Sequence, residues 1–120
     1  MNVVILRGRL SSVSARRILS SGSELLSLEI TTVTESGQTS VPVAWFDPPA
    51  GAEPAIGEEL VVRGTVRRRF FRTGAGTQSR TEVVADEVVG VSRRRQVTKL
   101  MATVAEQIGA TPAGAVSRAC

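Results

Sequence analysis

A short basic and aromatic window has the clearest chemistry of any segment in this chain. Residues 63–72 read RGTVRRRFFR, in which five arginines flank two adjacent phenylalanines. Successive side chains of an extended strand point to opposite faces, so alternate residues share one face: Arg63, Arg67, Arg69 and Phe71. Arginine donates parallel hydrogen bonds to a phosphate, and an aromatic ring stacks on a nucleobase without reading its identity. The window therefore predicts a surface that holds a flexible polyanion.

The same window has a second interpretation, because charged side chains also protect a free sheet edge from aggregation. We assign the binding role to Arg67, Arg69 and Phe71, since cations and a ring on one face form the usual platform for a single strand. The remaining arginines of the window extend the candidate surface: Arg63, Arg68 and Arg72. Phe70 points to the opposite face, and we predict that it lies in the core.

Charged residues outside the window give weaker indications. Arg7 and Arg9 share one face of the expected first strand, where they either extend the basic track or flank a subunit interface. Arg16 and Arg17 precede a turn, where they either contact phosphate or, as we prefer, serve surface solubility. Glu29 projects opposite to the core residues of its strand. It would place a negative charge on the binding face and weaken the affinity for an anion.

Composition excludes several kinds of chemistry. The 120 residues carry 15 lysines and arginines against 11 acidic residues, for a net charge of +4, and all but one of the cations are arginine. There is no histidine and one cysteine, so we expect no metal site, no disulfide framework and no histidine acid or base. The carboxylates of Glu82, Asp86 and Glu87 have no neighbouring histidine, cysteine or lysine. We predict no catalytic residue, no cofactor, no small-molecule substrate and no enzymatic activity.

The cysteine content fits a reducing, cytoplasmic location. The apolar run Val3–Leu6 is too short for a signal segment or a membrane span, and Arg7 interrupts it. We therefore expect no membrane partner.

Strand patterns dominate the first ninety residues. Five segments alternate apolar and polar residues or are rich in β-branched residues: 2–10, 25–34, 39–46, 58–71 and 80–91. Three segments of turn and loop composition separate them: a tight turn at 35–38, a proline-rich loop at 47–57 and a flexible glycine-rich loop at 73–79. Pro42 predicts an edge or a bulge in the third strand, and Trp45 is expected to anchor the core.

Five short strands without a βαβ alternation or an internal repeat predict an all-β domain. The five-stranded OB-fold barrel is the expected architecture, and a small β-sandwich is an alternative that the residue pattern does not separate from it. After the barrel, the apolar spacing changes to that of an amphipathic helix over 97–108, which ends at Gly109. We assign 1–92 to the barrel and 93–120 to a basic linker, this helix and a frayed C-terminus.

The segments NVVILRGRL, ARRILSSGSELLSLEITT, VVRGTVRRRFF and SRTEVVADEV, in this order, resemble strands of the bacterial single-stranded-DNA-binding protein family. The resemblance implies an OB-fold, sequence-tolerant binding of single-stranded DNA and a nucleoid-associated role in DNA replication and repair. It also implies a homo-oligomer that pairs through first strands, with a tetramer preferred over a dimer. Val3 and Ile5, on the outward face of this strand, would be exposed to water in a monomer.

The sequence departs from the family in three places. The family has a helix between its third and fourth strands, where this chain has the proline-rich loop 47–57, so we propose that the helix 97–108 covers that end of the barrel. Packing on a neighbouring subunit, or a loose linker, are the alternatives. The family's third-strand tryptophan aligns with Val41, and the chain has no tyrosine. We also find no acidic tail of the kind by which the family recruits partners, so we do not expect a hub role.

Two classes of function follow. The first is a binder of single-stranded DNA that relies on arginines with limited aromatic stacking. The second is an OB-fold interaction module in which DNA binding is weak or lost, or which binds RNA or serves a primosome-type assembly. The thinned aromatics and Glu29 favour the second class, and the arginine-rich face favours the first.

Overall fold

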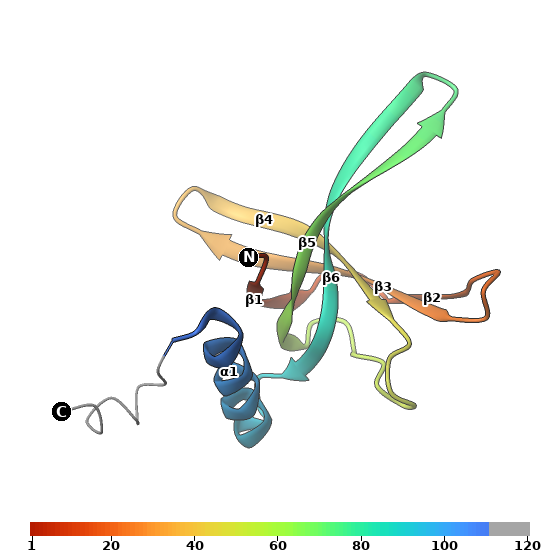
Figure 1. The fold of residues 1–120 in the computed structure, drawn as a ribbon. Helices are drawn as coiled ribbons and strands as arrows, with labels where there is room; N and C mark the ends of the chain where they lie inside the picture. Colours follow the sequence, from red (N-terminus) through yellow and green to blue (C-terminus); the bar gives the residue numbers. More distant parts are fainter. Residues whose placement is uncertain (111–120) are drawn as a thin grey trace.

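The computed structural model describes residues 1–110, which form six strands followed by one helix (Figure 1). The expected frayed segment 111–120 lies outside the described residues. The elements have these bounds: β1 Val4–Leu10, β2 Ala15–Ile18, β3 Glu24–Thr34, β4 Gly37–Phe46, β5 Glu59–Thr73, β6 Gly76–Gly90 and α1 Arg94–Ile108. All five expected strands are present, and β2 is a short additional one.

Five of the strands close into a barrel. The order is β1-β5-β6-β4-β3-β2, and a further pairing of β1 with β3 joins the two sides. All neighbours are antiparallel except β4 and β6, which pair in parallel over Val43–Trp45 and Val83–Ala85. β2 lies outside this ring as a hairpin partner of β3. A closed five-stranded ring with one C-terminal helix confirms the predicted OB-fold and excludes the sandwich.

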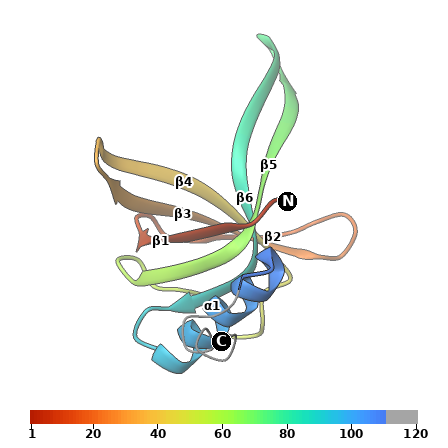
Figure 2. The ribbon, with the colours of Figure 1, turned by 60° about the vertical axis from the view of Figure 1, so that its left-hand side comes forward.

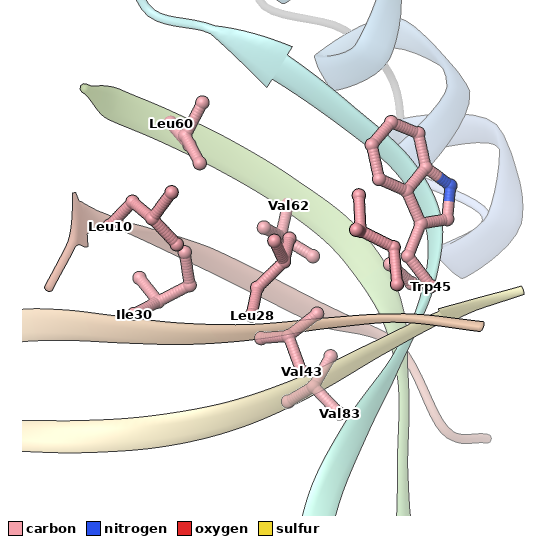
Figure 3. Packing of buried hydrophobic residues seen from close by; sticks show 10 residues of the cluster. Leu10, Leu28, Ile30, Val43, Trp45, Leu60, Val62 and Val83 are labelled. Atoms are coloured by element: carbon pink, nitrogen blue, oxygen red, sulfur yellow. The ribbon is translucent and has the colours of Figure 1, made fainter. Parts of the chain in front are cut away.

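The barrel interior holds the main hydrophobic core, which Figure 3 shows. Leu26, Ile30 and Val62 are fully buried at its centre, and Trp45 is 6% exposed, so the prediction that this ring anchors the core is confirmed. Gly8 is required where the ring closes, because a Cβ there would collide with the carbonyl oxygen of Thr31 on β3. A residue without a side chain thus lets β1 and β3 approach.

Between β4 and β5, the loop 47–57 is not helical, as the sequence predicts. Ala52 of this loop packs against the barrel core. Pro42 pairs with Glu29 of β3 at a point where β4 has no second neighbour, since β6 contacts only Val43–Trp45. The predicted edge position of this proline is therefore confirmed.

α1 packs on the outside of the barrel, and not over its open end as we had proposed. Leu100 and Val104 are buried against Val61 and Val89, which point outward from β5 and β6. The helix begins at Arg94, three residues before the predicted start. Val3 packs at the edge of the same cluster, so the expectation that this residue is wet in a monomer is wrong. The alternation of residues along β1 predicts that Val3 points outward, but only the fold shows that it packs against the cluster beneath α1.

Three hairpins extend beyond the barrel, formed by β2–β3, β3–β4 and β5–β6 (Figure 2). The longest is β5–β6, in which both strands have 15 residues. Its register shifts at Asp86, which has no partner between Arg63↔Glu87 and Gly64↔Ala85. A bulge of this kind bends the strands and increases their twist. β5 separates from β1 at this point, whereas β6 stays paired with β4 as far as Val83, beyond which the hairpin projects from the barrel.

The structure has a hairpin at the expected flexible loop 73–79, but the predicted length of the loop is wrong. β5 continues to Thr73 and β6 starts at Gly76, which leaves a turn of two residues. Gly76 has a φ of 117°, a conformation that residues with a side chain rarely adopt. A tight turn with this glycine favours continued strand pairing, so polar residues that suggested a loop are ladder residues.

Candidate nucleic-acid interface

A basic groove of about 480 Å³ lies on the outer face of the barrel, between the β2–β3 hairpin, β4 and the β5–β6 hairpin. Five arginines and two glutamates are its charged residues: Arg16, Arg17, Arg67, Arg69, Arg80, Glu29 and Glu82. In OB-folds, this face and the loops that border it are the usual site of oligonucleotide and oligosaccharide binding. The groove therefore has both the location and the charge for an anionic chain.

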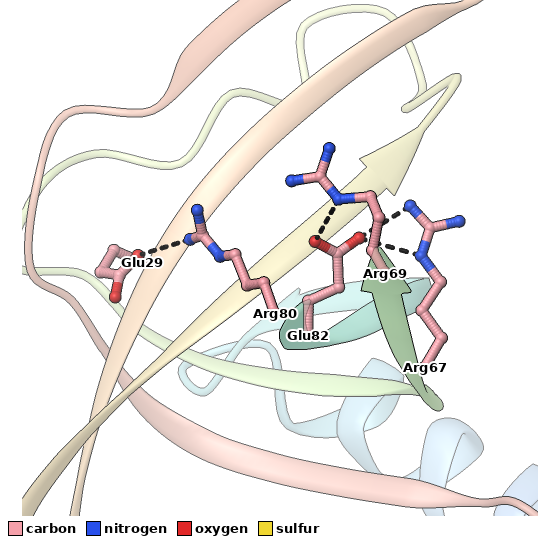
Figure 4. A network of polar contacts seen from close by, with 5 residues as sticks. All are labelled: Glu29, Arg67, Arg69, Arg80 and Glu82. Carbon is pink, nitrogen blue, oxygen red and sulfur yellow. Dashed lines mark hydrogen bonds and ion pairs between the residues drawn. The ribbon is translucent and has the colours of Figure 1, made fainter. Parts of the chain in front are cut away.

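Glu82 organises the arginines of the β5–β6 hairpin (Figure 4). Its side chain is 6% exposed, and its Oε2 accepts hydrogen bonds from Nε and Nη2 of Arg67 at 2.9 and 2.7 Å. Oε1 forms an ion pair with Nε of Arg69 at 3.5 Å. A buried carboxylate needs such partners, because burial without them would be costly. One glutamate thus holds two guanidinium groups in the groove.

Each of these arginines also lies over an aromatic ring. The guanidinium carbon of Arg67 is 5.4 Å from the ring centre of Phe46, and that of Arg69 is 5.7 Å from the ring centre of Phe71. Both distances are within the range of cation–π attraction. The predicted common face of Arg67, Arg69 and Phe71 is confirmed. Phe46 joins them from β4.

Arg80 is the groove residue that sequence reasoning missed. It pairs with Arg69 in the β5–β6 ladder, and its Nη2 lies 3.8 Å from Oε2 of Glu29 on β3. The expected negative charge of Glu29 is present in the groove, and Arg80 faces it there. The hairpin register would have identified Arg80 from sequence, but that register depends on the two-residue turn.

Arg16 and Arg17 line the groove from β2, although the sequence assigned them to surface solubility. Arg16 forms ion pairs with Glu24 at 3.3 Å and with Glu53 at 3.8 Å. The short strand β2 pairs with β3, which places Arg16 opposite Leu26 and Arg17 opposite Leu25. The sequence pattern did not predict β2, so it did not indicate where two arginines next to a turn would point.

Other predicted site residues lie outside the groove. Arg63 is bound by acidic neighbours, since its Nε is 3.3 Å from Glu87 and its Nη1 is 3.6 Å from Asp86. Only 16% of its side chain is exposed. Arg63 therefore neutralises the two carboxylates at the bulge. It shares the strand face of Arg67, as predicted.

Arg7 and Arg9 lie on the outer face of β1 beside a separate depression. Arg7 donates to a carboxylate oxygen of Glu59 at 2.8 Å, and this hydrogen bond lowers the pKa of Glu59 below its usual value. Arg9 donates to the carbonyl oxygen of Gly57 at 3.2 Å. Both arginines tie β1 to the start of β5, so they do not extend the groove.

The opposite face of the β5–β6 hairpin carries Arg68, Phe70 and Arg72. Phe70 is 66% exposed, so the prediction that it lies in the core is wrong. Its strand face is the one that points inward in the barrel, but β5 has already left the barrel at this position. The alternation of residues therefore predicted the strand face of Phe70 correctly, but it did not predict that this face is exposed to solvent here.

No helix within residues 1–110 is long and apolar enough to cross a membrane. In the same part of the chain, no group of three or more acidic, histidine or cysteine side chains is placed to hold a metal ion.

The arrangement belongs to the OB-fold class of small β-barrels. No family model matches the chain, and no curated protein matches its sequence. Among solved structures, the fold is similar to that of a Plasmodium falciparum single-stranded-DNA-binding protein in complex with single-stranded DNA, with a TM-score of 0.64 and 15% identity. The match covers 75% of this chain and 94% of that chain. At this identity the likeness establishes the fold.

Proposed function

We propose that this chain binds single-stranded DNA in the basic groove, with little preference for sequence. The observation that supports this most directly is the set of five arginines on the binding face of an OB-fold, two of them fixed by Glu82 beside the rings of Phe46 and Phe71. The likeness to a protein solved with single-stranded DNA supports the same assignment.

The chemistry of the groove favours a single strand over a duplex. A ring can stack only on a base whose face is free, and the rings here stand next to guanidinium groups that suit phosphates. The five groove arginines hold the backbone in this proposal, and Phe71 and Phe46 stack bases. Stacking does not distinguish the bases, so binding tolerates different sequences.

One observation favours the alternative of an interaction module. Arg16, Arg67, Arg69 and Arg80 each face a carboxylate within the described residues, which partly neutralises the groove. A phosphate must compete with these carboxylates, and a protein partner would not need to. Weak or absent DNA binding, or a preference for RNA, would support this second function.

We further propose a homo-oligomer that pairs through β1, with a tetramer preferred over a dimer. β1 pairs with β3 only at Arg9 and Leu10, so within the described part of the chain its edge over residues 4–7 on that side has no neighbouring strand. Ile5 points outward and is 39% exposed. A free edge beside an exposed apolar side chain suits pairing with a second copy. Membership of the bacterial family, and a cytoplasmic, nucleoid-associated role in replication and repair, complete the proposal.

A fluorescence-anisotropy titration with labelled oligo-dT, oligo-dA and RNA of the same length tests the function. We expect comparable affinities for the two DNA sequences and weaker binding of the corresponding duplex. A clear preference for RNA would select the RNA-binding alternative. The absence of binding to all three at low salt would select the interaction module.

A further inference from the structure

The back face of the β5–β6 hairpin combines an exposed ring with two arginines that have no acidic partner within residues 1–110. Val66, Arg68, Phe70 and Arg72 alternate along β5 on this face, and Thr81, Ser79 and Thr77 lie opposite the last three on β6. Phe70 is 66% exposed and Val66 is 42% exposed. The two side chains form an exposed apolar patch beside the arginines, which is more informative than a single exposed side chain.

The two hairpin faces differ in charge compensation. On the groove face, Arg67 and Arg69 contact Glu82, and Arg80 faces Glu29. Among the described residues, Arg68 and Arg72 have no ion pair, and the residues opposite them are threonines. Their full charges are therefore available to a phosphate. Arg68 and Arg72 are four residues apart, so about 13 Å separates them along β5, and Phe70 lies midway between them.

The position of the hairpin leaves both of its faces accessible. Beyond Val66 and Val83, β5 and β6 pair only with each other among the described residues, and Figure 1 shows the hairpin extending away from the barrel. The amide of Asn2 closes the free edge of β5 where the hairpin begins, because it donates to the carbonyl oxygen of Val66 at 2.7 Å and accepts from its N–H at 2.9 Å. From this point to the turn, the edge of β5 is open.

We propose that a single strand longer than the groove passes around the β5–β6 hairpin and occupies its back face. There, Phe70 stacks a base while Arg68 and Arg72 contact the flanking phosphates. This inference rests on the proposed function, and it means that both faces of the hairpin bind nucleic acid. Its consequence is a site that depends on oligonucleotide length.

Phe70→Ala tests the stacking role with two lengths of oligo-dT, about 6 and about 25 nucleotides, which bracket the usual site sizes of a single OB-fold. We expect the affinity for the long strand to fall by about 5- to 100-fold, the usual cost of one lost stacking contact. The affinity for the short strand should change by less than about twofold. An exposed ring contributes little to folding, and a thermal melt verifies this.

Arg68→Ala with Arg72→Ala tests the phosphate contacts. The slope of log K against log salt for the long strand should become shallower by about 1.4, since each lost contact removes about 0.7. Arg94→Ala with Arg95→Ala is the matched control, because it removes the same charge from α1, away from the hairpin. An equal change in the control would mean that only overall charge matters, and it would overturn the proposal.

The outcomes separate this inference from the proposed function. If the wild type binds neither length, both fail. If the wild type binds both lengths and Phe70→Ala leaves the long-strand affinity unchanged, the groove function stands and the back-face site is wrong. If Phe70→Ala weakens both lengths equally, or changes the subunit number in light scattering, the back face supports the groove or a second copy, and the inference is also wrong.

Discussion

Arg67 donates two hydrogen bonds, at 2.9 and 2.7 Å, to the same carboxylate oxygen of Glu82, which leaves the other oxygen for Arg69. This division lets one buried acidic group orient two cations that remain about half exposed. The arginines are thus fixed before any ligand arrives, which reduces the side-chain entropy that binding must overcome.

Glu82→Gln should strengthen the binding of single-stranded DNA by several-fold at low salt. The substitution keeps the shape of the side chain and removes a negative charge from the groove, so phosphates compete with one fewer anion. The free energy of unfolding should fall by about 1–2 kcal/mol, because Arg67 and Arg69 lose the anionic acceptor of their hydrogen bonds. Anisotropy titration and a thermal melt measure the two effects. Weaker binding would show that orientation of Arg67 and Arg69 outweighs the added charge.

Phe71→Ala should weaken oligonucleotide binding by about 1–3 kcal/mol and leave the barrel stable, if the ring stacks on a base. Phe71 is 37% exposed and lies beyond the barrel, so its removal opens no core cavity. Trp45→Ala provides the contrast, since this buried ring should cost about 3–5 kcal/mol of stability. A large loss of stability with Phe71→Ala, at unchanged affinity, would place this ring in a structural role.

The contrast between Phe70 and Phe71 shows which features of the site could be predicted from the sequence and which could not. Alternation placed Arg67, Arg69 and Phe71 on one face, and the structure has them there. The same alternation put Phe70 on the inward face, but no local pattern marks where β5 leaves the barrel. That point is set by the bulge at Asp86, a feature of strand pairing.

Long-range pairing also determined the other differences. Arg80 enters the groove through its register with Arg69, which depends on the tight turn at Gly76. Val3 is covered because α1 packs over the outward side of the barrel. The five strand segments along the chain, the core position of Trp45 and the non-helical loop 47–57 could be predicted, because they follow from composition, alternation and proline chemistry.

Leu100→Ala should destabilise the protein by about 2–4 kcal/mol, because it leaves a cavity between α1 and the barrel. Leu100 is fully buried against the outward face of β5 and β6. Met101→Ala is the matched control on the same helix, where the side chain is 46% exposed and the cost should stay below about 1 kcal/mol. Equal effects in chemical denaturation would mean that the helix does not dock on the barrel in solution.

Ile5→Arg should lower the subunit number if copies pair through β1. A charged side chain in an apolar interface is left without a partner, which opposes association. Ile18→Arg, on the exposed strand β2, should leave the subunit number unchanged. Multi-angle light scattering at micromolar concentration measures both variants. A wild-type protein that is already monomeric would contradict the proposed oligomer.

The salt dependence of binding to an oligo-dT of about eight nucleotides is the most direct test of the groove. Five groove arginines in contact with phosphates predict a slope of log K against log salt of about −3.5. Replacing Arg69 and Arg80 together by alanine should make the slope shallower by about 1.4. The same number of alanines at Arg94 and Arg95 should leave it nearly unchanged. A slope near zero, or no binding at low salt, would contradict the proposal that this groove holds single-stranded DNA.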